Sequence, residues 1–304
     1  MIHQKFLTSL LLGAAVAVPC LADEPLITRN EATSEANQPT PDANYETARD
    51  LLKRQSVDGD TKKGFNPMLQ SAEGGYLPAM AGVAYLYNVG MGVEKDDSKA
   101  AEWYRKAAEK NHSISQFNLG RLLISDEVPL PSGATDRTSQ HREGIEWIHK
   151  AADAKLTAAQ AEWGVILLRG DFDTKPDAAE AERYLAPAAD AGNPDAMNAL
   201  GTMYQFGKGV LKDRTVAERY FRKAAMAGNV KAQANLGDFL DPSSKIPELR
   251  IEAVAWLFLA EEAKNTFAIK VLQNKLPAIS QEDIAAARKK ADELSAQIVR
   301  TQQK

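Results

Sequence analysis

Cysteine is almost absent from this chain of 304 residues: Cys20 is the only one, and there are four histidines. A disulfide framework needs paired cysteines, and zinc sites draw on several cysteines or histidines at short spacing. Because Cys20 lies close to the N-terminus, the sequence predicts neither disulfides nor thiol chemistry in the rest of the chain.

An excess of positive charge is missing too. Lysine and arginine together number 37 against 41 acidic residues, which gives a formal net charge of -4. A nucleic-acid binder needs basic surface to displace counterions from the phosphates, so this balance argues against nucleic acid as a partner. The hydrophobic share of 44% and the charged share of 26% are ordinary values for a folded soluble protein.

Long apolar runs are missing as well. The apolar segment Phe6–Val18 is too short to cross a bilayer, since a spanning helix needs about 20 residues. It follows the positively charged Lys5 and ends just before Cys20 and Ala22, two small residues at the positions that a signal peptidase reads. Residues 1–22 therefore predict a signal peptide cleaved after Ala22, and a periplasmic or secreted protein without a transmembrane span.

A second interpretation of this segment is a lipoprotein signal with Cys20 acylated. Such signals carry a small residue directly before the cysteine, whereas this chain has Pro19 there. Residues 23–44 are polar, contain three prolines and show no periodic apolar face. Such a segment buries too little to offset its ordering entropy, so it predicts a flexible linker.

What the sequence does contain is a repeat. A small residue recurs at steps of 36, 44, 37 and 36 residues, an aromatic follows it at nearly the same period, and an alanine pair follows the aromatic. These positions are Ala84, Gly120, Gly164, Gly201 and Gly237; Trp103, Trp147, Tyr184, Tyr220 and Trp256; and Ala107-Ala108, Ala151-Ala152, Ala188-Ala189 and Ala224-Ala225. A degenerate first unit from Tyr45 to Tyr76 fits the same frame.

Each recurring feature has a physical reason in a helix–turn–helix unit. The small residues let two helix backbones approach closely, and the aromatic is expected to fill the core between neighbouring units. Aspartates at 60, 96, 177 and 213 stand just before the second helix, where a carboxylate caps free amides and complements the helix dipole. Asp177 with Glu180 predicts a capping box, and Gly192-Asn193 and Gly228-Asn229 predict helix ends.

One helix pair buries little surface alone, so the units must stack into one array. Residues 45–265 therefore predict about six repeats. Residues 266–304 predict capping helices, because the segment opened by Ser280 carries an apolar stripe at spacings of three and four. The stripe consists of Ile284, Ala287, Ala291, Leu294 and Ile298.

The pattern resembles the Sel-1-like repeat, a relative of the tetratricopeptide repeat. The segment Ala196–Asn229 carries it most completely, with Leu200-Gly201, Tyr204, Gly207, Gly209-Val210, Asp213, Tyr220, Ala224-Ala225 and Gly228. The resemblance implies an all-α, right-handed α-solenoid whose first helices line the concave side. Two units depart from the pattern: one carries eight extra residues between Ile124 and Ile145, and the last has DPSSKIPE in place of the glycine turn.

Residues that could carry chemistry have simpler roles in this frame. The run from Asp171 to Glu182 imitates a calcium loop, but Lys175 and Pro176 stand where a ligand and a glycine are needed. His141 and His149 lack a third ligand at metal spacing. No G-x-S-x-G elbow is present. We therefore predict no catalytic residue, no metal and no cofactor.

The remaining candidate is a surface. Polar residues that vary between units flank the recurring small residue of the first helices: Tyr85, Asn118, Arg121, Glu162, Thr202, Gln205, Asn235 and Asp238. They predict a groove for a peptide or a partner helix; the alternative is an ordinary solvated face. The insertion 125–142 is a second candidate binding element, since long loops of solenoids tend to lie on the binding face.

These features predict an exported, monomeric scaffold that binds protein partners in the cell envelope and is not an enzyme. The alternative is a periplasmic immunity or inhibitor protein that binds a secreted antibacterial effector, a role that the family resemblance permits. Cysteine-rich relatives with assigned enzymatic activity also exist, but this chain lacks their paired cysteines.

Overall fold

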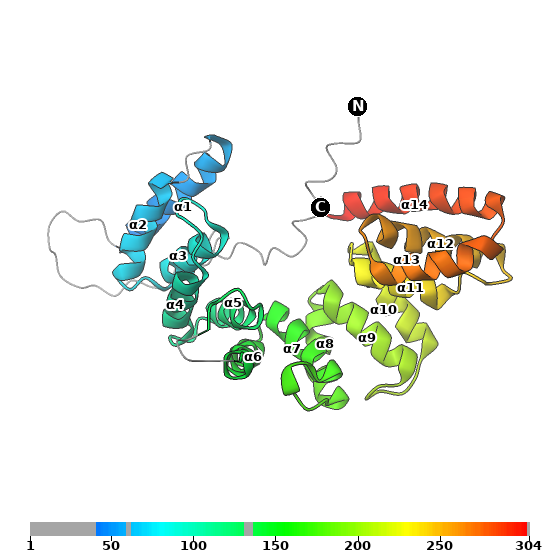
Figure 1. Ribbon diagram of the computed structural model, residues 1–304, viewed down its shortest axis with the longest axis horizontal. Coiled ribbons are helices and arrows are strands. Elements are labelled where there is room, and N and C mark those ends of the chain that lie inside the picture. Colours follow the sequence, from blue (N-terminus) through cyan, green and yellow to red (C-terminus); the bar gives the residue numbers. More distant parts are fainter. Residues whose placement is uncertain (1–40, 59–61, 131–135, 303–304) are drawn as a thin grey trace. The chain divides into compact units, whose positions relative to one another are not determined.

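A computed structural model describes residues 41–58, 62–130 and 136–302. The predicted signal peptide, most of the predicted linker, Asp60 and the middle of the insertion lie outside the described residues. The described residues form α-helices and two 3₁₀ turns and contain no strand, which confirms the all-α class. Figure 1 shows the helices following one another as antiparallel neighbours along the chain.

The helices come in consecutive pairs. Their bounds are α1 Pro41–Asp58, α2 Lys62–Glu73, α3 Leu77–Val89, α4 Asp97–Ala108, α5 Ser113–Ile124, α6 Thr138–Asp153, α7 Thr157–Arg169, α8 Ala178–Asp190, α9 Pro194–Phe206, α10 Arg214–Met226, α11 Val230–Leu240, α12 Pro247–Glu262, α13 Thr266–Lys275 and α14 Gln281–Gln302; the 3₁₀ turns are η2 Asp171–Asp173 and η3 Leu276–Ala278. The chain divides into two compact units within α7, Met1–Ala159 and Gln160–Lys304, and each is described by itself.

The first helix begins earlier than the sequence suggested. Helix α1 starts at Pro41, so the last four residues of the predicted linker, 41–44, are helical. Proline is well tolerated in the first turn of a helix, because the amide it lacks would have no intrahelical partner there. Pro41 therefore already belongs to the folded part, which was predicted to begin at Tyr45.

The aspartates that precede the second helices act as predicted. The backbone amides of Lys99, Glu180 and Val216 each donate to the carboxylate three residues earlier, on Asp96, Asp177 and Asp213, at 2.9 Å. In each case the cap residue's own amide donates back to the first helix; that of Asp213, for instance, donates to the carbonyl of Tyr204 at 3.0 Å. Each turn is thus tied at both ends.

The predicted capping box of Asp177 and Glu180 forms only by half. The amide of Asp177 donates to the carbonyl of Leu167 at 2.9 Å, and the carboxylate of Glu180 instead accepts from Arg183 at 2.6 Å. The tie between the turn and the first helix has taken the amide that a box would need.

The predicted helix ends at Gly192 and Gly228 are confirmed, with φ of +90° and +87°. Asparagine at the next position does more than end a helix. Asn193 and Asn229 accept from the amides three residues on, at 3.0 Å and 2.8 Å, and so cap the helices that follow, α9 and α11. His112 caps α5 in the same place, with Nδ1 accepting from the Ser115 amide at 3.3 Å.

The small residues lie at close helix approaches, as predicted. A Cβ added to Gly164, Gly201 or Gly237 would lie 2.5 to 2.6 Å from the side chain of Leu185, Phe221 or Leu257 respectively. Each contacted side chain belongs to the second helix of the same pair. The recurring glycine is therefore required by packing within the pair.

The prediction that the aromatic stripe is core was wrong for four of its five members. Trp103, Trp147, Tyr184 and Tyr220 are half-buried, and Trp256 alone is fully buried. The core position is the next residue along, occupied by Tyr104, Ile148, Leu185, Phe221 and Leu257. One residue turns a helix by about 100°, which is enough to move a side chain from the core to its margin.

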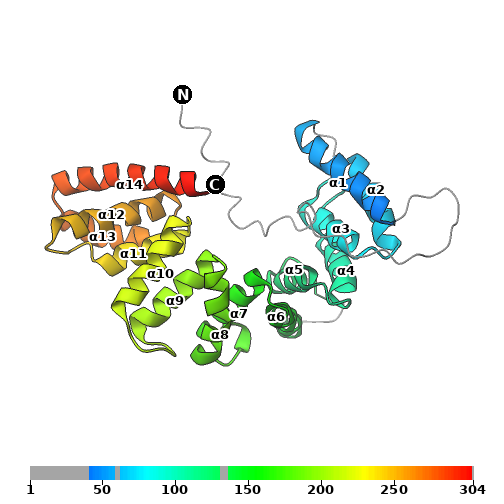
Figure 2. The same ribbon diagram turned by 180° about the vertical axis from the view of Figure 1, so that it is seen from behind.

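Helix α14 packs against α12 and reaches the end of α10 (Figures 1 and 2). Ala287, Ala291, Leu294 and Ile298 are buried in the core of this unit, and Ile284 packs against it, which confirms the predicted stripe. The hydroxyl of Ser280 accepts from the Asp283 amide at 3.1 Å and starts the helix. Gln302 donates to the Ala227 carbonyl at 3.4 Å and holds its far end.

Candidate interaction surfaces

The polar face of the first helices is best defined in the second unit, on α9 and α11. The Asn235 side-chain amide donates to Asn198 at 2.8 Å, and the Thr202 hydroxyl donates to the backbone carbonyl of Asn198 at 3.1 Å. Thr202 and Asn235, both predicted, are thus joined by Asn198, which the sequence analysis missed. Gln205 lies one turn beyond Thr202 on α9 and is half-buried.

Asp238 completes this face and is the predicted residue most open to solvent. Desolvation by the surrounding protein raises the pKa of its carboxyl and Asp241 adds to the rise, while the positive charge of Lys275 opposes it. A carboxylate in such a place is ready to accept a hydrogen bond or a cation from a partner.

The other predicted residues lie on different helices. Tyr85 is on α3, Asn118 and Arg121 are on α5, and Glu162 is on α7, all half-buried. The guanidinium carbon of Arg121 lies 5.8 Å from the centroid of the Phe117 ring, one turn earlier on the same helix. Asn118 and Arg121 are three residues apart on α5 and share its face.

Polar contacts join the two described ends of the insertion 125–142 to each other, and Glu127 pairs with Lys95 outside it at 3.0 Å. The carbonyl of Val128 accepts from Arg137 at 2.8 Å and from Gln140 at 3.3 Å. Asp126 pairs with Arg137 at 3.2 Å and with His141 at 2.8 Å. Residues 138–142 begin α6, and the middle of the insertion, 131–135, lies outside the described residues.

The residues that imitated a metal site have structural roles. Asp171 and Asp173 belong to the 3₁₀ turn η2, and Asp177 caps α8. His141 pairs with Asp126, and His149 lies 3.6 Å from Asp153. Across the ranges that the structure covers, no group of three or more histidine, cysteine, aspartate or glutamate side chains is placed to hold a metal ion.

Two matching polar clamps join successive second helices, and neither was predicted from the sequence. In the first unit Arg105 on α4 donates to Glu143 on α6 at 2.8 Å, and the Trp147 indole donates to the same carboxylate oxygen at 3.2 Å. In the second unit Arg222 on α10 donates to Glu252 on α12, which also accepts from the Trp256 indole at 3.3 Å.

The register of the two clamps is identical. The arginine stands two residues after one recurring aromatic, and the glutamate stands four residues before the next. That spacing was the available signal. The clamps explain why Trp147 can remain half-buried, because its indole N–H has a partner at the margin of the core.

A pocket of about 410 Å³ lies in the second unit. It is lined by residues 242–245 together with Arg250, Lys275 and residues 278–280 and 283. Arg250 is occupied there, with Nε and Nη2 on Asp283 at 2.9 Å and 2.7 Å and Nη1 on the Ser244 carbonyl at 2.6 Å. The ion pair thus joins the start of α14 to α12.

None of the helices among residues 41–58, 62–130 and 136–302 combines the length and the apolar character that crossing a membrane requires. The predicted signal peptide is not part of those ranges.

Known proteins share this architecture. The family model of the Sel1 repeat matches five consecutive segments, 77–112, 113–156, 157–193, 194–229 and 230–265. The predicted first unit, Tyr45–Tyr76, lies outside this match, although α1 and α2 do form a helix pair.

Among solved structures, a Sel1 repeat protein from Oxalobacter formigenes is 27% identical, with a TM-score of 0.59 over 74% of this chain and 88% of that one. A protective antigen of uropathogenic Escherichia coli strains with an SLR fold is 20% identical, with a TM-score of 0.55 over 87% of this chain and 64% of that one; this likeness concerns the fold alone. Chitin synthase regulatory factor 3 of Schizosaccharomyces pombe is 28% identical over 162 residues, which are 52% of this chain but 16% of that protein.

Proposed function

Because the chain belongs to the Sel1 repeat family, a family of generally non-catalytic scaffolds built on a protein-interaction fold, we propose that it is an exported scaffold that binds protein partners in the cell envelope. The proposed export rests on the signal peptide predicted in residues 1–22. The proposed binding surface is the polar face of the first helices.

The observation that carries the proposal is the arrangement around Asn198. Its side chain and backbone hold Asn235 and Thr202 on adjacent helices, so these polar groups are fixed before any partner arrives. Preorganised polar groups lose less conformational entropy on binding than free side chains do. Most other polar groups singled out in the sequence cap helices or pair with neighbouring side chains, which leaves this face available for recognition.

Affinity capture from envelope extracts tests the surface, with Arg121→Glu and Asn235→Arg as the disrupting variants. Arg121 lies in the first unit and Asn235 in the second, so the two variants are made singly as well as together. Lys223→Glu is the matched control, because Lys223 is exposed on α10, a second helix. We expect the partner to be lost with the disrupting variants and retained with the control.

Thermal unfolding of each variant must accompany the capture, since Asn235→Arg also removes the hydrogen bond to Asn198. If the folded double variant still captures every partner, the face is not the binding surface.

The identity of the captured partner separates the scaffold from its alternative. A resident envelope complex that is disturbed when this chain is deleted supports the scaffold. A secreted effector that kills cells only when this chain is missing would instead make the protein an inhibitor of that effector.

A further inference from the structure

The turn between α9 and α10 carries two apolar side chains that the fold leaves in water. Leu211 is 90% exposed and Phe206 is 62% exposed. Lys208 lies between them and Lys212 follows Leu211; the next residue, Asp213, uses its carboxylate to cap α10 through the Val216 amide. Among the described residues neither lysine has an ion-pair partner. Two exposed apolar groups and two unpaired cations thus share one turn of seven residues, 206–212.

The shape of this turn does not require those side chains. The turn after α3 has the same backbone: Gly90 and Gly92 have φ of +70° and +74°, and Gly207 and Gly209 have +71° and +72°. In that turn the position of Leu211 is occupied by Glu94. A charged residue therefore satisfies the same geometry, and the leucine needs another explanation.

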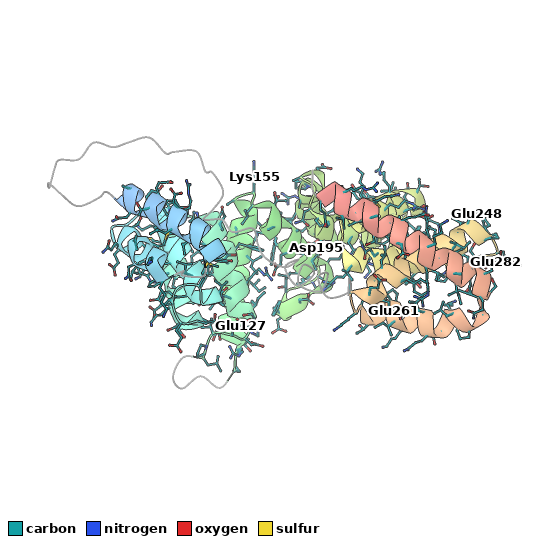
Figure 3. The ribbon with its side chains drawn as sticks, turned by 90° about the horizontal axis from the view of Figure 1, so that it is seen from above. Glu127, Lys155, Asp195, Glu248, Glu261 and Glu282 are labelled. Atoms are coloured by element: carbon teal, nitrogen blue, oxygen red, sulfur yellow. The ribbon has the colours of Figure 1, made fainter. Side chains whose placement is uncertain are left out.

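The lysine that follows this position also differs between the two turns in its ion pairs. Lys95, which corresponds to Lys212, pairs with Asp97 at 3.2 Å and with Glu127 at 3.0 Å. Figure 3 marks Glu127. The first turn therefore neutralises its lysine within the protein, whereas the turn 206–212 keeps both of its charges available.

The turn 206–212 is held firmly, so its tip is a fixed projection. The amide of Lys208 donates to the Met203 carbonyl and that of Asp213 to the Tyr204 carbonyl, both at 3.0 Å. Gly209 packs directly on the start of α8: a Cβ there would lie 2.7 Å from the backbone carbon of Ala178. The backbone of the turn is therefore held by contacts with both α8 and α9.

We propose that the turn 206–212 is a contact site for the surface of an anionic phospholipid bilayer, with Phe206 and Leu211 entering the interface and Lys208 and Lys212 facing the anionic headgroups. Apolar groups that enter the headgroup region gain free energy from leaving water, and each nearby lysine adds attraction to anionic lipid.

A bilayer suits this projection better than a protein does. A stable protein interface buries about 1,200–2,000 Å² in total. A single turn of seven residues offers only a small part of that area. A bilayer admits single side chains at any point and needs no complementary pocket. The neighbouring turns each expose one apolar residue, Phe172 at 41% and Ile246 at 54%, whereas the turn 206–212 exposes two, Phe206 at 62% and Leu211 at 90%. The site is therefore centred on 206–212.

The test uses the full chain with Cys20→Ser and a single new cysteine, labelled with an environment-sensitive dye. Leu211→Cys places the dye at the tip of the turn. Val299→Cys places it at a 40% exposed position on α14 and serves as the control. The dye reports its own surroundings, so lipid binding by the apolar segment Phe6–Val18 cannot imitate the result.

The probes are vesicles of phosphatidylethanolamine with phosphatidylglycerol, and vesicles of phosphatidylcholine alone. We expect a blue shift at position 211 on the anionic vesicles, none at position 299, and none on phosphatidylcholine. Replacing Lys208 and Lys212 with glutamine should remove the shift. Without the dye, Leu211→Glu, which copies Glu94, should lower the turn's contribution to vesicle partitioning by about tenfold or more.

Three outcomes would overturn the proposal. No shift at position 211 on either vesicle means that the turn does not touch lipid. An equal shift on both vesicles means that anionic headgroups are not recognised. A shift caused by a purified protein partner and not by vesicles means that the turn is a protein-docking site.

Discussion

Gly120 on α5 and Gly144 on α6 face each other where the two helices of their repeat meet. A Cβ added to Gly120 would lie 2.5 Å from the Gly144 carbonyl oxygen, and one added to Gly144 would lie 2.7 Å from the Gly120 carbonyl oxygen. Other repeats have alanine at the second position, as with Ala181 and Ala253. In this repeat both positions are glycine, so the two backbones can approach more closely.

Gly120→Ala and Gly144→Ala should therefore each destabilise the protein, although alanine favours helix formation. The overpacking cost of about 1–3 kcal/mol is set against a gain of about 1 kcal/mol in helix propensity, which leaves a net loss of up to about 2 kcal/mol. Urea unfolding measures the change. Ser139→Ala, at an exposed position on the same α6, is the control and should be neutral. A stabilising effect of Gly144→Ala would show that the helices can separate freely.

The neighbouring residues Phe221 and Tyr220 lie in the core and at its margin, respectively. Phe221 is completely buried, whereas Tyr220 is half-buried and stacks on Tyr204 with ring centroids 5.9 Å apart. Phe221→Ala should cost about 3–5 kcal/mol, and Tyr220→Ala only about 1 kcal/mol. Chemical unfolding of the two variants side by side decides the point, and equal losses would contradict the assignment of the core to position 221.

The sequence was sufficient for the fold because the repeat shows the same requirement several times. Gly201 and Gly237 recur where two backbones meet, and Asp213 recurs where amides need a cap, so the helix pairs and their turns could be predicted. The side of the second helix that enters the core could not. Aromatics recur at one position and mixed residues such as Ile148, Leu185 and Phe221 at the next, and recurrence of residue type favoured the wrong one.

The interaction surface was harder to predict because its contacts cross between helices. Thr202 and Asn235 were chosen from their place beside the recurring glycine. Asn198, which joins them, is an asparagine that the other repeats do not have at the same position. The exposed Leu211 was also missed, since its importance appears only when the turn is compared with the one that holds Glu94. A sequence read position by position contains neither relationship.

Lys155, marked in Figure 3, adopts a left-handed backbone with φ of +63° at the end of α6. The corresponding position in later repeats is Gly192 or Gly228. A residue with a Cβ is strained in this conformation, so Lys155→Gly should stabilise the protein by up to about 1 kcal/mol. The midpoint of thermal unfolding should rise. Lys223→Gly, inside α10, is the matched control and should destabilise by about 1 kcal/mol; a loss of stability at both sites would refute the strain at Lys155.

Asn229 connects two repeats as well as capping a helix. Its Oδ1 accepts from the Ala232 amide at 2.8 Å, and its Nδ2 donates at 2.8 Å to Asp195, at the start of α9 (Figure 3). Asn229→Ala removes both contacts and should cost about 1.5–2.5 kcal/mol. Asn265→Ala removes a cap without such a link and should cost about 1 kcal/mol. Equal costs in unfolding experiments would mean that the link to Asp195 adds no stability.

The clamp of Arg222 and Glu252 should make part of the stability depend on pH. Burial would raise the pKa of Glu252, but the hydrogen bonds and the positive charge of Arg222 outweigh it and hold that pKa below its ordinary value of 4.5. The folded state therefore binds the proton more weakly than the unfolded state. Its stabilising contribution is present above pH 4.5 and is lost as the pH falls through the lowered pKa.

Glu252→Gln tests this dependence, because glutamine keeps the shape and can still accept from Arg222 and Trp256. The variant should be less stable than the parent by about 1 kcal/mol at pH 7, a modest figure because the Arg222 side chain is 37% exposed and screened by solvent. Urea unfolding from pH 7 to pH 3 should show this difference shrinking below pH 4.5. Glu218→Gln, which removes the partner of Arg222 within α10, should cost only about 0.3–0.5 kcal/mol. A difference for Glu252→Gln that stays constant down to pH 3 would show that the ionised carboxylate does not carry the clamp.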